Sequence, residues 1–385
     1  MNAYGTATVV CVVGARPNYM KMAPIVRCMN ESSASLRPYL VHTGQHYDEA
    51  MSERLFRDLQ LPAADVNLNV GSASHAVQTA EIMRRFEPVI DDQKPTCVLV
   101  VGDVNSTLAC ALVAAKRGVP VAHVEAGLRS FDRGMPEEVN RVLTDQISDF
   151  LYTTEASAHA NLAREGIAAR YVRFVGNVMI DSLLAHQARA VQPEIVLRGA
   201  GLSPDLIRDP RGYAVVTLHR PSNVDDPKTL KTLLQAVREV SARLPVVWPL
   251  HPRTQRNADS FGLAHLLSGP RLILLPAQGY LEMLGLMANA TVVLTDSGGI
   301  QEETTALSVP CLTLRENTER PVTVEQGTNV VVGRDRQRIL SALDEILTTG
   351  GKRGRKPELW DGRAAERIVS HLATALVSDP HPVEA

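Results

Sequence analysis

The stretch CVLVVGDVNSTLACALVAAKRGVPVAHVE, residues 97–125, contains a complete strand-helix-strand pattern. Its two ends, CVLVVGD (97–103) and VPVAHVE (119–125), are short apolar runs, and a helical pattern separates them. Continuous apolar runs that alternate with helices are typical of a parallel sheet whose two faces are both covered by helices. The stretch therefore predicts an α/β fold.

The same alternation recurs along the chain in two series, which predicts two α/β domains. The 385 residues are enough for two domains that each bury a core. The first series also contains TVVCVVG (8–14), YLVHTG (39–44) and DFLYTT (149–154). The second contains YAVVTLH (213–219), PVVWPLH (245–251), RLILLP (271–276), ATVVLTD (290–296) and VPCLTL (309–314).

A segment rich in Pro, Gly and charged residues separates the two series at 190–212, and it predicts a linker. We expect a first Rossmann-like domain over 1–177 and a second over 190–360. A final helical pattern at about 362–378 follows a segment rich in Gly, Lys, Arg and Pro.

Composition excludes several classes of partner. A net charge of -2 offers no general attraction to nucleic acid or to an anionic membrane. An aromatic content of 4% disfavours stacking platforms for single-stranded nucleic acid. The five cysteines show no CxxC spacing, which predicts buried free thiols in a reducing compartment. The chain has no signal-like start and no apolar stretch of membrane-spanning length, so we expect a cytoplasmic protein.

Polar residues end many of the expected strands. In open α/β sheets, ligands bind beyond the carboxyl ends of the strands, so two sheets that face each other would enclose one site in a central cleft. The residues concerned include Gly14-Ala15-Arg16, Asp103, Glu125, His219 and Asp296-Ser297-Gly298-Gly299.

TDSGGIQEE (295–303) predicts a phosphate site. Small residues such as Ser297 and Gly298 let a phosphate approach the first N–H groups of a helix. The alternative is a simple turn in which Ser297 only caps the helix. Glu303 follows about one turn later, where it could reach a ribose.

Two further segments add cations. GARPNYMKMAPIV (14–26) repeats the strand-to-helix geometry, and there Arg16 and Lys21 bracket the start of the helix. Arg320 precedes a proline in ENTERPVT (316–323). Together with the Ser-Gly-Gly turn, these residues suggest a diphosphate. His219 at a strand end is either catalytic or a hydrogen-bonded structural residue.

HVEAGLRSFDRGMPEEVNR (123–141) is rich in charged residues, and we interpret it as the acid/base half of an active site. Asp103 and Glu125 end two expected neighbouring strands, and Glu137 and Arg141 share one face of a helix that begins at Pro136. Glu137 and Arg141 could instead form an ordinary exposed ion pair. Convergence of three carboxylates would raise at least one pKa, as acid/base chemistry requires.

No spacing predicts a metal or a redox cofactor. His42 and His46 form an HxxxH pattern, but a strand end and Gly44 separate them, so a zinc site is not expected. The chain also lacks the GxSxG, Walker and GxGxxG motifs.

These segments together resemble the non-hydrolysing UDP-N-acetylglucosamine 2-epimerases. The resemblance runs from about residue 8 to 333 and includes VGARPNYMKMAP, TGQH, GDVNST, HVEAGLRS, PEEVNR, TLHRPSNVD, TDSGGIQEE and TERPVTVEQGTN. It implies a GT-B architecture, in which two Rossmann-like domains face a cleft and the last helix packs back on the first domain. It also implies inversion at C2 of UDP-N-acetylglucosamine, without a cofactor, through elimination and re-addition of UDP.

The resemblance further implies roles for individual residues. Asp103, Glu125 and Glu137 would be acid/base carboxylates, and His219 would be catalytic beside the sugar and diphosphate. The substrate-binding residues would be Arg16, Lys21, Arg141, Met283, Ser297, Gly298, Glu303 and Arg320. Gln45 and His251 are compatible with an allosteric site, and a homodimer is expected by analogy. The alternatives are an epimerase of a related UDP-amide sugar, a hydrolysing epimerase, a GT-B glycosyltransferase and a non-catalytic sensor of nucleotide sugars.

Overall fold

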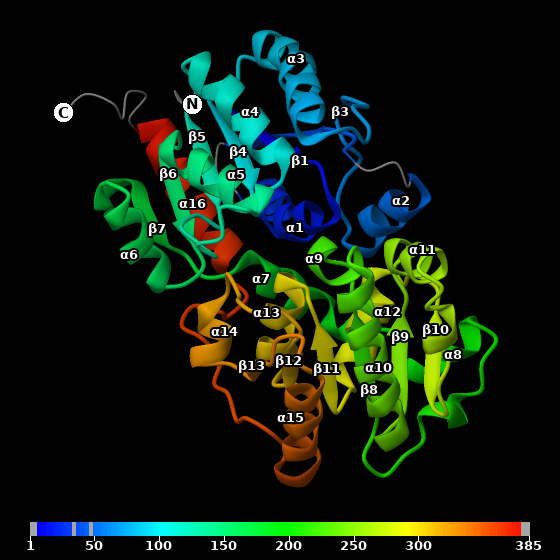
Figure 1. Cartoon of the computed structure of the whole chain (residues 1–385). Helices are drawn as coiled ribbons and strands as arrows, with labels where there is room; N and C mark the ends of the chain where they lie inside the picture. Colours follow the sequence, from blue (N-terminus) through cyan, green and yellow to red (C-terminus); the bar gives the residue numbers. More distant parts are fainter. Residues whose placement is uncertain (1–5, 33–35, 46–48, 379–385) are drawn as a thin grey trace. The chain divides into compact units, whose positions relative to one another are not determined.

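The computed structural model describes residues 6–32, 36–45 and 49–378. These residues form two compact units (Figure 1). The first unit contains the described residues up to Ala185 together with those from Glu358 onward, and the second contains His186–Pro357.

The first unit is built on a sheet of seven parallel strands in the order β3-β2-β1-β4-β5-β6-β7. The strands are β1 (Ala7–Val13), β2 (Leu36–His42), β3 (Val66–Asn67), β4 (Cys97–Val101), β5 (Val121–Val124), β6 (Phe150–Thr153) and β7 (Val172–Phe174). The helices are α1 (Arg16–Glu31), α2 (Glu49–Asp58), α3 (His75–Gln93), α4 (Asn105–Lys116), α5 (Pro136–Gln146), α6 (Ser157–Arg164), α7 (Val178–His186), which leads into the second unit, and α16 (Ala364–Ser378).

The second unit is built on six parallel strands in the order β10-β9-β8-β11-β12-β13. The strands are β8 (Ala214–Thr217), β9 (Val246–Pro249), β10 (Leu272–Leu275), β11 (Val292–Thr295), β12 (Cys311–Thr313) and β13 (Asn329–Val331). The helices are α8 (Pro193–Gly199), α9 (Pro221–Val224), α10 (Pro227–Arg243), α11 (Pro252–Ser260), α12 (Tyr280–Ala288), α13 (Gly298–Leu307), α14 (Pro321–Glu325) and α15 (Arg336–Thr349).

Both sheets are doubly wound and share one topology, in which the first strand of the unit lies between its second and fourth. The point at which the strand order reverses therefore falls between β1 and β4 in the first unit and between β8 and β11 in the second. Ligands of such folds bind at this point, beyond the carboxyl ends of the strands. The prediction of two parallel-sheet α/β domains is confirmed.

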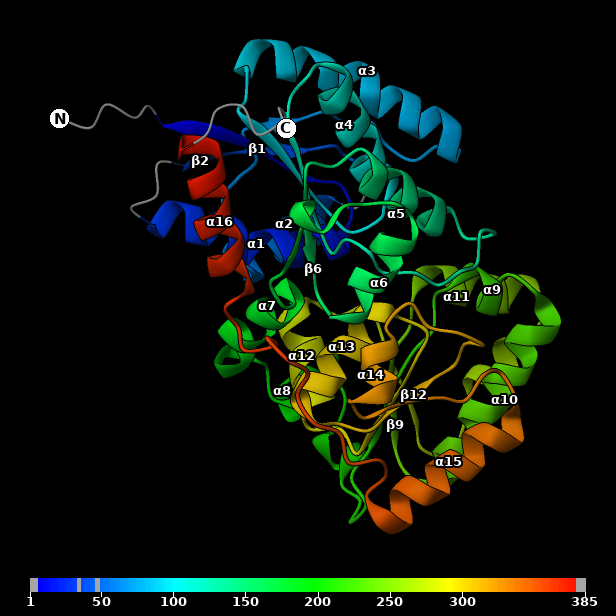
Figure 2. The ribbon, with the colours of Figure 1, turned by 90° about the vertical axis from the view of Figure 1, so that its left-hand side faces the viewer.

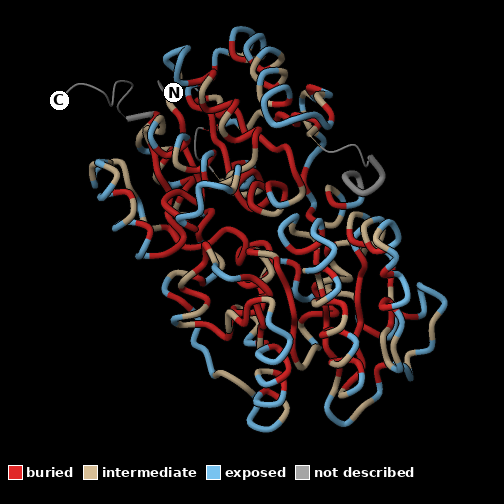
Figure 3. The backbone as a smooth tube through the Cα atoms, viewed as in Figure 1, coloured by how far each residue is buried: buried red, intermediate tan, exposed pale blue. Residues whose placement is uncertain are grey.

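Apolar side chains of alternate strand residues fill separate layers on the two faces of the second sheet. Val246, Trp248 and Leu294 pack with α10 and α15 on one face. Val247 and Val293 pack on the other face, with residues of α8 and α12. The strands buried along their whole lengths (Figure 3) are β4, β5, β6, β9, β11 and β12. Burial of this kind explains why the strands read as continuous apolar runs.

Local sequence explains where many of the helices begin. Proline occupies the first position of α5, α10 and α11, where its missing N–H would have no partner within the helix. Asp226 caps α10, because its carboxylate accepts the N–H of Thr229 at 2.8 Å. The helix predicted to begin at Pro136 is α5, which ends at Gln146.

The sequence did not indicate three strands, and one predicted linker is wrong. The strands β3, β7 and β13 have two or three residues each and lie at sheet edges, so they are too short to show a pattern. The segment 190–212 belongs to the second unit, because Val196, Leu197 and Ile207 are buried in its core. Its Pro and Gly residues bound short helices that pack on the sheet.

The final helix, α16, returns to the first unit and packs against α1 (Figure 2). Its start is held by Asp181 of α7, whose carboxylate accepts the N–H groups of Ala364 at 3.2 Å and Ala365 at 2.7 Å. Burial, together with nearby Asp361, raises the pKa of Asp181 to about 6, although the two N–H groups and Arg367 oppose the shift.

This raised pKa predicts a pH-dependent contribution to stability. A carboxyl group with a pKa raised in the folded state stabilises that state below its ordinary pKa, and the contribution disappears as the pH rises through about 6. The free energy of unfolding of the wild type relative to Asp181→Asn should therefore fall by about 2.4 kcal/mol between pH 4 and pH 7.

Urea unfolding of the first unit can be followed through Trp360, which is buried there, in a Trp248→Phe background that removes the tryptophan of the second unit. Asp91→Asn, at an exposed carboxylate paired with Arg117, serves as the control and should show a much smaller pH-dependent difference. A difference between wild type and Asp181→Asn that stays constant from pH 4 to pH 7 would contradict the assignment.

Candidate functional site

Asp103 and Glu125 follow two hydrogen-bonded strands, β4 and β5, in which Val101 pairs with Val124. Gly102 has φ 69° and Glu125 has φ 77°. The left-handed conformation suits glycine, but it costs a glutamate on the order of 1–2 kcal/mol. Strain of this kind at a strand end is typical of functional sites. The prediction that the two strand ends are neighbours is confirmed.

Glu125 forms a buried ion pair with Lys21 of α1. Lys21 Nζ lies 2.5 Å from Glu125 Oε2, and the two side chains are 7% and 2% exposed. A Cβ atom at Gly102 would lie 3.0 Å from this Nζ, so only glycine leaves the lysine its full room. The pair keeps a carboxylate and an ammonium group together in a largely desolvated place, where their interaction is strong.

Asn18 ties the start of α1 to the end of β4. The side-chain oxygen of Asn18 accepts the N–H of Gly14 at 3.2 Å and that of Ala15 at 3.0 Å. Asn18 also donates to the carbonyl of Val101 at 2.9 Å, which ties α1 to the end of β4. Arg16 is the first residue of α1 and is partly exposed. The N–H groups of Gly14 and Ala15 therefore already donate hydrogen bonds within the fold.

Arg141 of α5 connects Asp103 to the helix. It forms ion pairs with Asp103 and with Glu138, and its Nη1 lies 2.5 Å from Glu138 Oε2. Arg141 is 2% exposed, so the alternative of an exposed pair with Glu137 is wrong. The Asp103 side chain remains 21% exposed. Glu137 is partly buried in the first turn of α5.

Glu138 is a carboxylate whose role the sequence did not reveal. It accepts the N–H of Ser130 at 3.0 Å and that of Phe131 at 2.8 Å, so it holds the preceding loop as well as Arg141. Its spacing of three residues from Arg141 was visible, but an adjacent pair of glutamates gives no indication of which one faces inward. Full burial of Glu138 and only partial burial of Glu137 is a tertiary effect.

In the second unit, Asp296 organises the end of β8. Asp296 has no exposed surface, and its carboxylate accepts the N–H groups of His219 at 3.0 Å and Arg220 at 2.9 Å. His219 Nδ1 lies 3.2 Å from Asp296 Oδ1, while the imidazole remains 38% exposed. Asp296 therefore orients His219. The position of Asp296 directly after β11 is the sequence feature that indicated this residue.

The start of α13 presents an anion-binding arrangement. Ser297 stands at the N-cap position, but its side chain makes no capping hydrogen bond, so the simple capping alternative is wrong. A Cβ atom at Gly298 would lie only 2.7 Å from Glu319 Oε1, so glycine allows close packing at the first helical position. The first N–H groups of a helix and its dipole attract negative charge.

Three arginines and two glutamates surround this helix start. Arg320 Nε lies 2.8 Å from Glu302 Oε1, and Glu319 lies 2.8 Å from Arg315 and 3.6 Å from Arg220. Burial raises the pKa of Glu319, but the charges of Arg320, Arg315 and Arg220 outweigh it and hold the pKa well below its usual range. With both glutamates ionised the cluster carries a net positive charge, which suits a phosphate.

The remaining predicted residues lie nearby or in supporting positions. Glu303 is buried within α13. The burial of Tyr280 and the nearby charge of Glu303 together raise the pKa of Tyr280. Met283 is partly buried on α12 and packs against the core. Gln45 accepts a hydrogen bond from Ser106 at 2.7 Å in the first unit. His251 caps α11, where it accepts the N–H of Arg253, and its ring lies 5.6 Å from that of His219.

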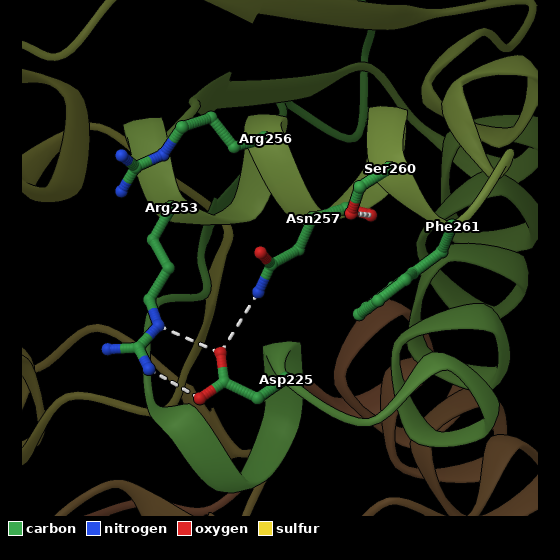
Figure 4. A pocket seen from close by; sticks show the side chains of 6 residues that line it. All are labelled: Asp225, Arg253, Arg256, Asn257, Ser260 and Phe261. Carbon is green, nitrogen blue, oxygen red and sulfur yellow. Dashed lines mark hydrogen bonds and ion pairs between the residues drawn. The ribbon is translucent and has the colours of Figure 1, made fainter.

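A surface pocket of about 440 Å³ lies between α9 and α11 of the second unit and contains none of the predicted residues. Asp225, Arg253 and Asn257 point toward one another in it (Figure 4), and Asp225 Oδ1 accepts from Arg253 Nε at 2.8 Å and from Asn257 at 2.9 Å. Asp225 and Arg253 thus pair with each other within the pocket.

Neither a metal cluster nor a membrane span occurs in the described part of the chain. No three His, Cys, Asp or Glu side chains there come together in a way that could hold a metal ion. No described helix combines the length and hydropathy needed to cross a membrane. His46 of the HxxxH pattern lies outside the described residues. The five cysteines are free thiols, and all except Cys28, which is partly exposed, are buried.

Comparison with known proteins identifies the family. The family model of UDP-N-acetylglucosamine 2-epimerase matches residues 29–373. A UDP-N-acetylglucosamine 2-epimerase of Methanocaldococcus jannaschii is 42% identical over 364 residues, which cover 94% of this chain and 97% of that protein. The UDP-2,3-diacetamido-2,3-dideoxy-D-glucuronate 2-epimerase of Pseudomonas aeruginosa is 40% identical over 373 residues, which cover 95% and 99%.

A solved structure of a relative agrees with the sequence comparison. The crystal structure of the Methanocaldococcus jannaschii UDP-GlcNAc 2-epimerase in complex with UDP-GlcNAc and UDP aligns with a TM-score of 0.88 at 40% identity. The alignment covers 96% of this chain and 100% of that one. The extent of the match and the two doubly wound units with polar strand ends lead to one conclusion: the chain belongs to the UDP-N-acetylglucosamine 2-epimerase family.

Proposed function

We propose that the protein reversibly epimerises C2 of UDP-N-acetylglucosamine to give UDP-N-acetylmannosamine. The observation that carries the proposal is the pairing of carboxylates with cations at the ends of β4 and β5, namely Glu125 with Lys21 and Asp103 with Arg141. Carboxylates that are paired with cations beyond the carboxyl ends of parallel strands supply groups that can exchange protons with a bound sugar.

The proposed reaction proceeds by elimination and re-addition. A carboxylate removes the proton from C2, the electron pair of that C–H bond forms the C1–C2 double bond, and the C1–O bond breaks so that UDP leaves with its electrons. The intermediate is 2-acetamidoglucal. Protonation of C2 on the opposite face and return of UDP to C1 complete the inversion. Asp103, Glu125 and Glu137 are the proposed acid/base groups, acting in different protonation states.

The second unit is proposed to bind the departing UDP. The helix start at Ser297 and Gly298, with Arg315 and Arg320, would stabilise the charge that the diphosphate gains. His219, oriented by Asp296, would donate a hydrogen bond beside the diphosphate. Glu303 is proposed to hold the ribose and Met283 to pack near the uracil. Arg16, Lys21 and Arg141 would serve the sugar and diphosphate from the first unit.

A related UDP-amide sugar is the second candidate substrate. The reason is the 40% identity to the Pseudomonas aeruginosa relative, which is almost as high as the identity to the Methanocaldococcus jannaschii relative. That relative is named for a sugar with a second acetamido group and a carboxylate. The homodimer, the cytoplasmic location and an allosteric site at Gln45 and His251 stay predictions.

One NMR experiment tests the proposal against its alternatives. The purified protein is incubated in deuterated water with UDP-N-acetylglucosamine and, separately, with the diacetamido-glucuronate nucleotide. A non-hydrolysing epimerase incorporates deuterium at C2 and gives a product that is still a UDP-sugar. Accumulation of free N-acetylmannosamine and UDP would instead show a hydrolysing enzyme. If neither nucleotide exchanges its C2 proton, the proposal is contradicted. If one or both exchange, the nucleotide that exchanges faster identifies the amide sugar.

Gly298→Ala tests the UDP site directly. The added Cβ would lie 2.7 Å from Glu319 Oε1, and Glu319 is held by Arg315, so the change should cost about 1–3 kcal/mol of stability. We expect UDP to bind about tenfold more weakly by calorimetric titration, because the helix start and the arginines are displaced. Gly199→Ala, where a Cβ meets nothing within 4 Å, is the matched control and should leave UDP affinity unchanged. Equal affinities in the two variants would remove Gly298 from the site.

A further inference from the structure

We infer that His123 is held as an imidazolium ion and positions the acid/base carboxylates Asp103 and Glu125. This role rests on the proposed function, since it concerns the same reaction. His123 lies in β5, two residues before Glu125, and has no exposed surface. It is therefore a positioning residue that acts through its neighbours and does not contact the substrate.

Hydrogen-bond geometry requires a proton on Nε2 of His123 and, when Asp145 is ionised, a proton on Nδ1 as well. Its Nε2 lies 2.8 Å from the carbonyl oxygen of Gly102, and its Nδ1 lies 2.7 Å from Asp145 Oδ1. A backbone carbonyl can only accept a hydrogen bond, so Nε2 must donate. An ionised carboxylate also only accepts, so Nδ1 must donate as well if Asp145 is ionised.

Asp145 is arranged to stay ionised. Its second oxygen accepts the N–H of Gly127 at 3.0 Å and an N–H of Arg129 at 2.7 Å. Both contacts of the second oxygen are with donors, and one of these donors is the charged Arg129, so its surroundings favour the ionised carboxylate.

The charges around His123 balance only when it is protonated. Arg129 lies 2.7 Å from Asp145 and 2.6 Å from Glu165, so two cations alternate with two anions when His123 is an imidazolium. A neutral His123 would leave one excess negative charge in a cluster whose His123 and Asp145 side chains have no exposed surface. Unbalanced buried charge is strongly unfavourable, so the network favours the protonated form.

The position of His123 connects both strand ends of the proposed site. The carbonyl it binds belongs to Gly102, whose left-handed turn directs the chain into Asp103. A hydrogen bond from a cation is about twice as strong as a neutral one, so it fixes this turn firmly. Since a displacement of about 1 Å in a reacting group can cost roughly 100-fold in rate, a fixed turn matters for catalysis.

The protonation state can be tested without substrate. Long-range proton-nitrogen NMR spectra of protein with ¹⁵N-labelled histidine, recorded at pH 8 where ordinary histidines are neutral, should show one ring with both nitrogens protonated. This signal should vanish in His123→Gln and change to that of a neutral tautomer in Asp145→Asn. A wild-type spectrum in which His123 is singly protonated would overturn the inference, whatever the protein catalyses.

The positioning role is tested by kinetics. His123→Gln should lower kcat for C2 exchange about 100-fold and leave KM and UDP affinity within about twofold, since only alignment is lost. Asp145→Asn should cause a similar loss, and the double variant should show no further loss, because the two residues act as one unit. Tyr152→Phe in the neighbouring strand β6 is the control. It removes a buried hydroxyl group that is hydrogen-bonded to His371 of α16, and it should retain kcat.

The outcomes separate the two proposals. If the wild type exchanges the C2 proton, and both His123→Gln and Asp145→Asn keep a kcat near that of the wild type, the positioning role is overturned and the epimerase function stands. Absence of wild-type exchange with either nucleotide would overturn the function and the positioning role with it, while the NMR spectrum would still decide the imidazolium. If His123→Gln fails to fold, Asp145→Asn and the wild-type spectrum decide the inference.

Discussion

Replacement of Asp103 by Asn, or of Glu125 by Gln, is expected to lower deuterium incorporation at C2 about 10²- to 10⁴-fold, the range typical of a lost general acid or base. The amides keep the size of the side chains but cannot exchange the proton. Affinity for UDP should change little in calorimetric titration, because the nucleotide is proposed to bind the second unit. The loss should therefore appear in turnover and not in nucleotide binding.

The structure dictates how these two variants are controlled. Glu125→Gln leaves Lys21 buried beside a neutral amide, so the melting temperature must be measured alongside the exchange rate. Glu81→Gln, at a partly exposed carboxylate on α3 that pairs with Arg84 and Arg85, should exchange at the wild-type rate. Exchange near the wild-type rate in both active-site variants would refute the acid/base assignment.

Replacement of Arg320 by Ala is expected to weaken both UDP binding and turnover, with a loss of affinity of about 100-fold, equivalent to about 2.8 kcal/mol. Arg320 is buried at the start of α13, where it pairs with Glu302 and contributes to the low pKa of Glu319. Its removal takes away the charge that would face the diphosphate and leaves Glu302 without this partner. Calorimetric titration with UDP measures the first effect.

Stability must be separated from binding in this variant. Loss of one partner of a buried ion pair costs about 3–5 kcal/mol, so Arg320→Ala should also unfold at lower urea concentration. The double change Arg320→Ala with Glu302→Gln should recover part of the stability, because the unpaired charge is gone, but should not restore UDP affinity. Arg336→Ala, at an exposed pair with Glu239, is the control and should alter neither. UDP affinity that recovers in the double variant would place Arg320 outside the nucleotide site.

Several parts of the candidate site could be predicted from position alone. Asp103, Glu125 and His219 each follow an apolar run that forms a strand, and residues that follow parallel strands meet at one edge of a sheet. The Ser-Gly-Gly turn before α13 was visible for the same reason. Edge strands such as β3 and β7 escaped prediction because two or three half-exposed residues carry too little hydrophobic pattern.

The pairing of charges could not be predicted from the sequence. Arg141 pairs with Glu138 three residues before it and with Asp103 from another element, and the sequence offered Glu137 and Glu138 equally as partners. Lys21 turned inward to Glu125 although its neighbourhood suggested a phosphate site. Choices of this kind depend on which side chain is desolvated, and desolvation arises only when distant segments pack together.

By itself, the sequence determined the two α/β units, the strand ends that carry polar groups and the resemblance to the epimerase family, because hydrophobic periodicity and local motifs are properties of neighbouring residues. Only the tertiary structure decided the partners of those groups, such as Asp145 with His123, Asp296 with His219 and Glu319 with the arginines. The physical reason is that burial in a low-dielectric interior makes each charge depend on side chains from other elements, and the chain brings those elements together only on folding.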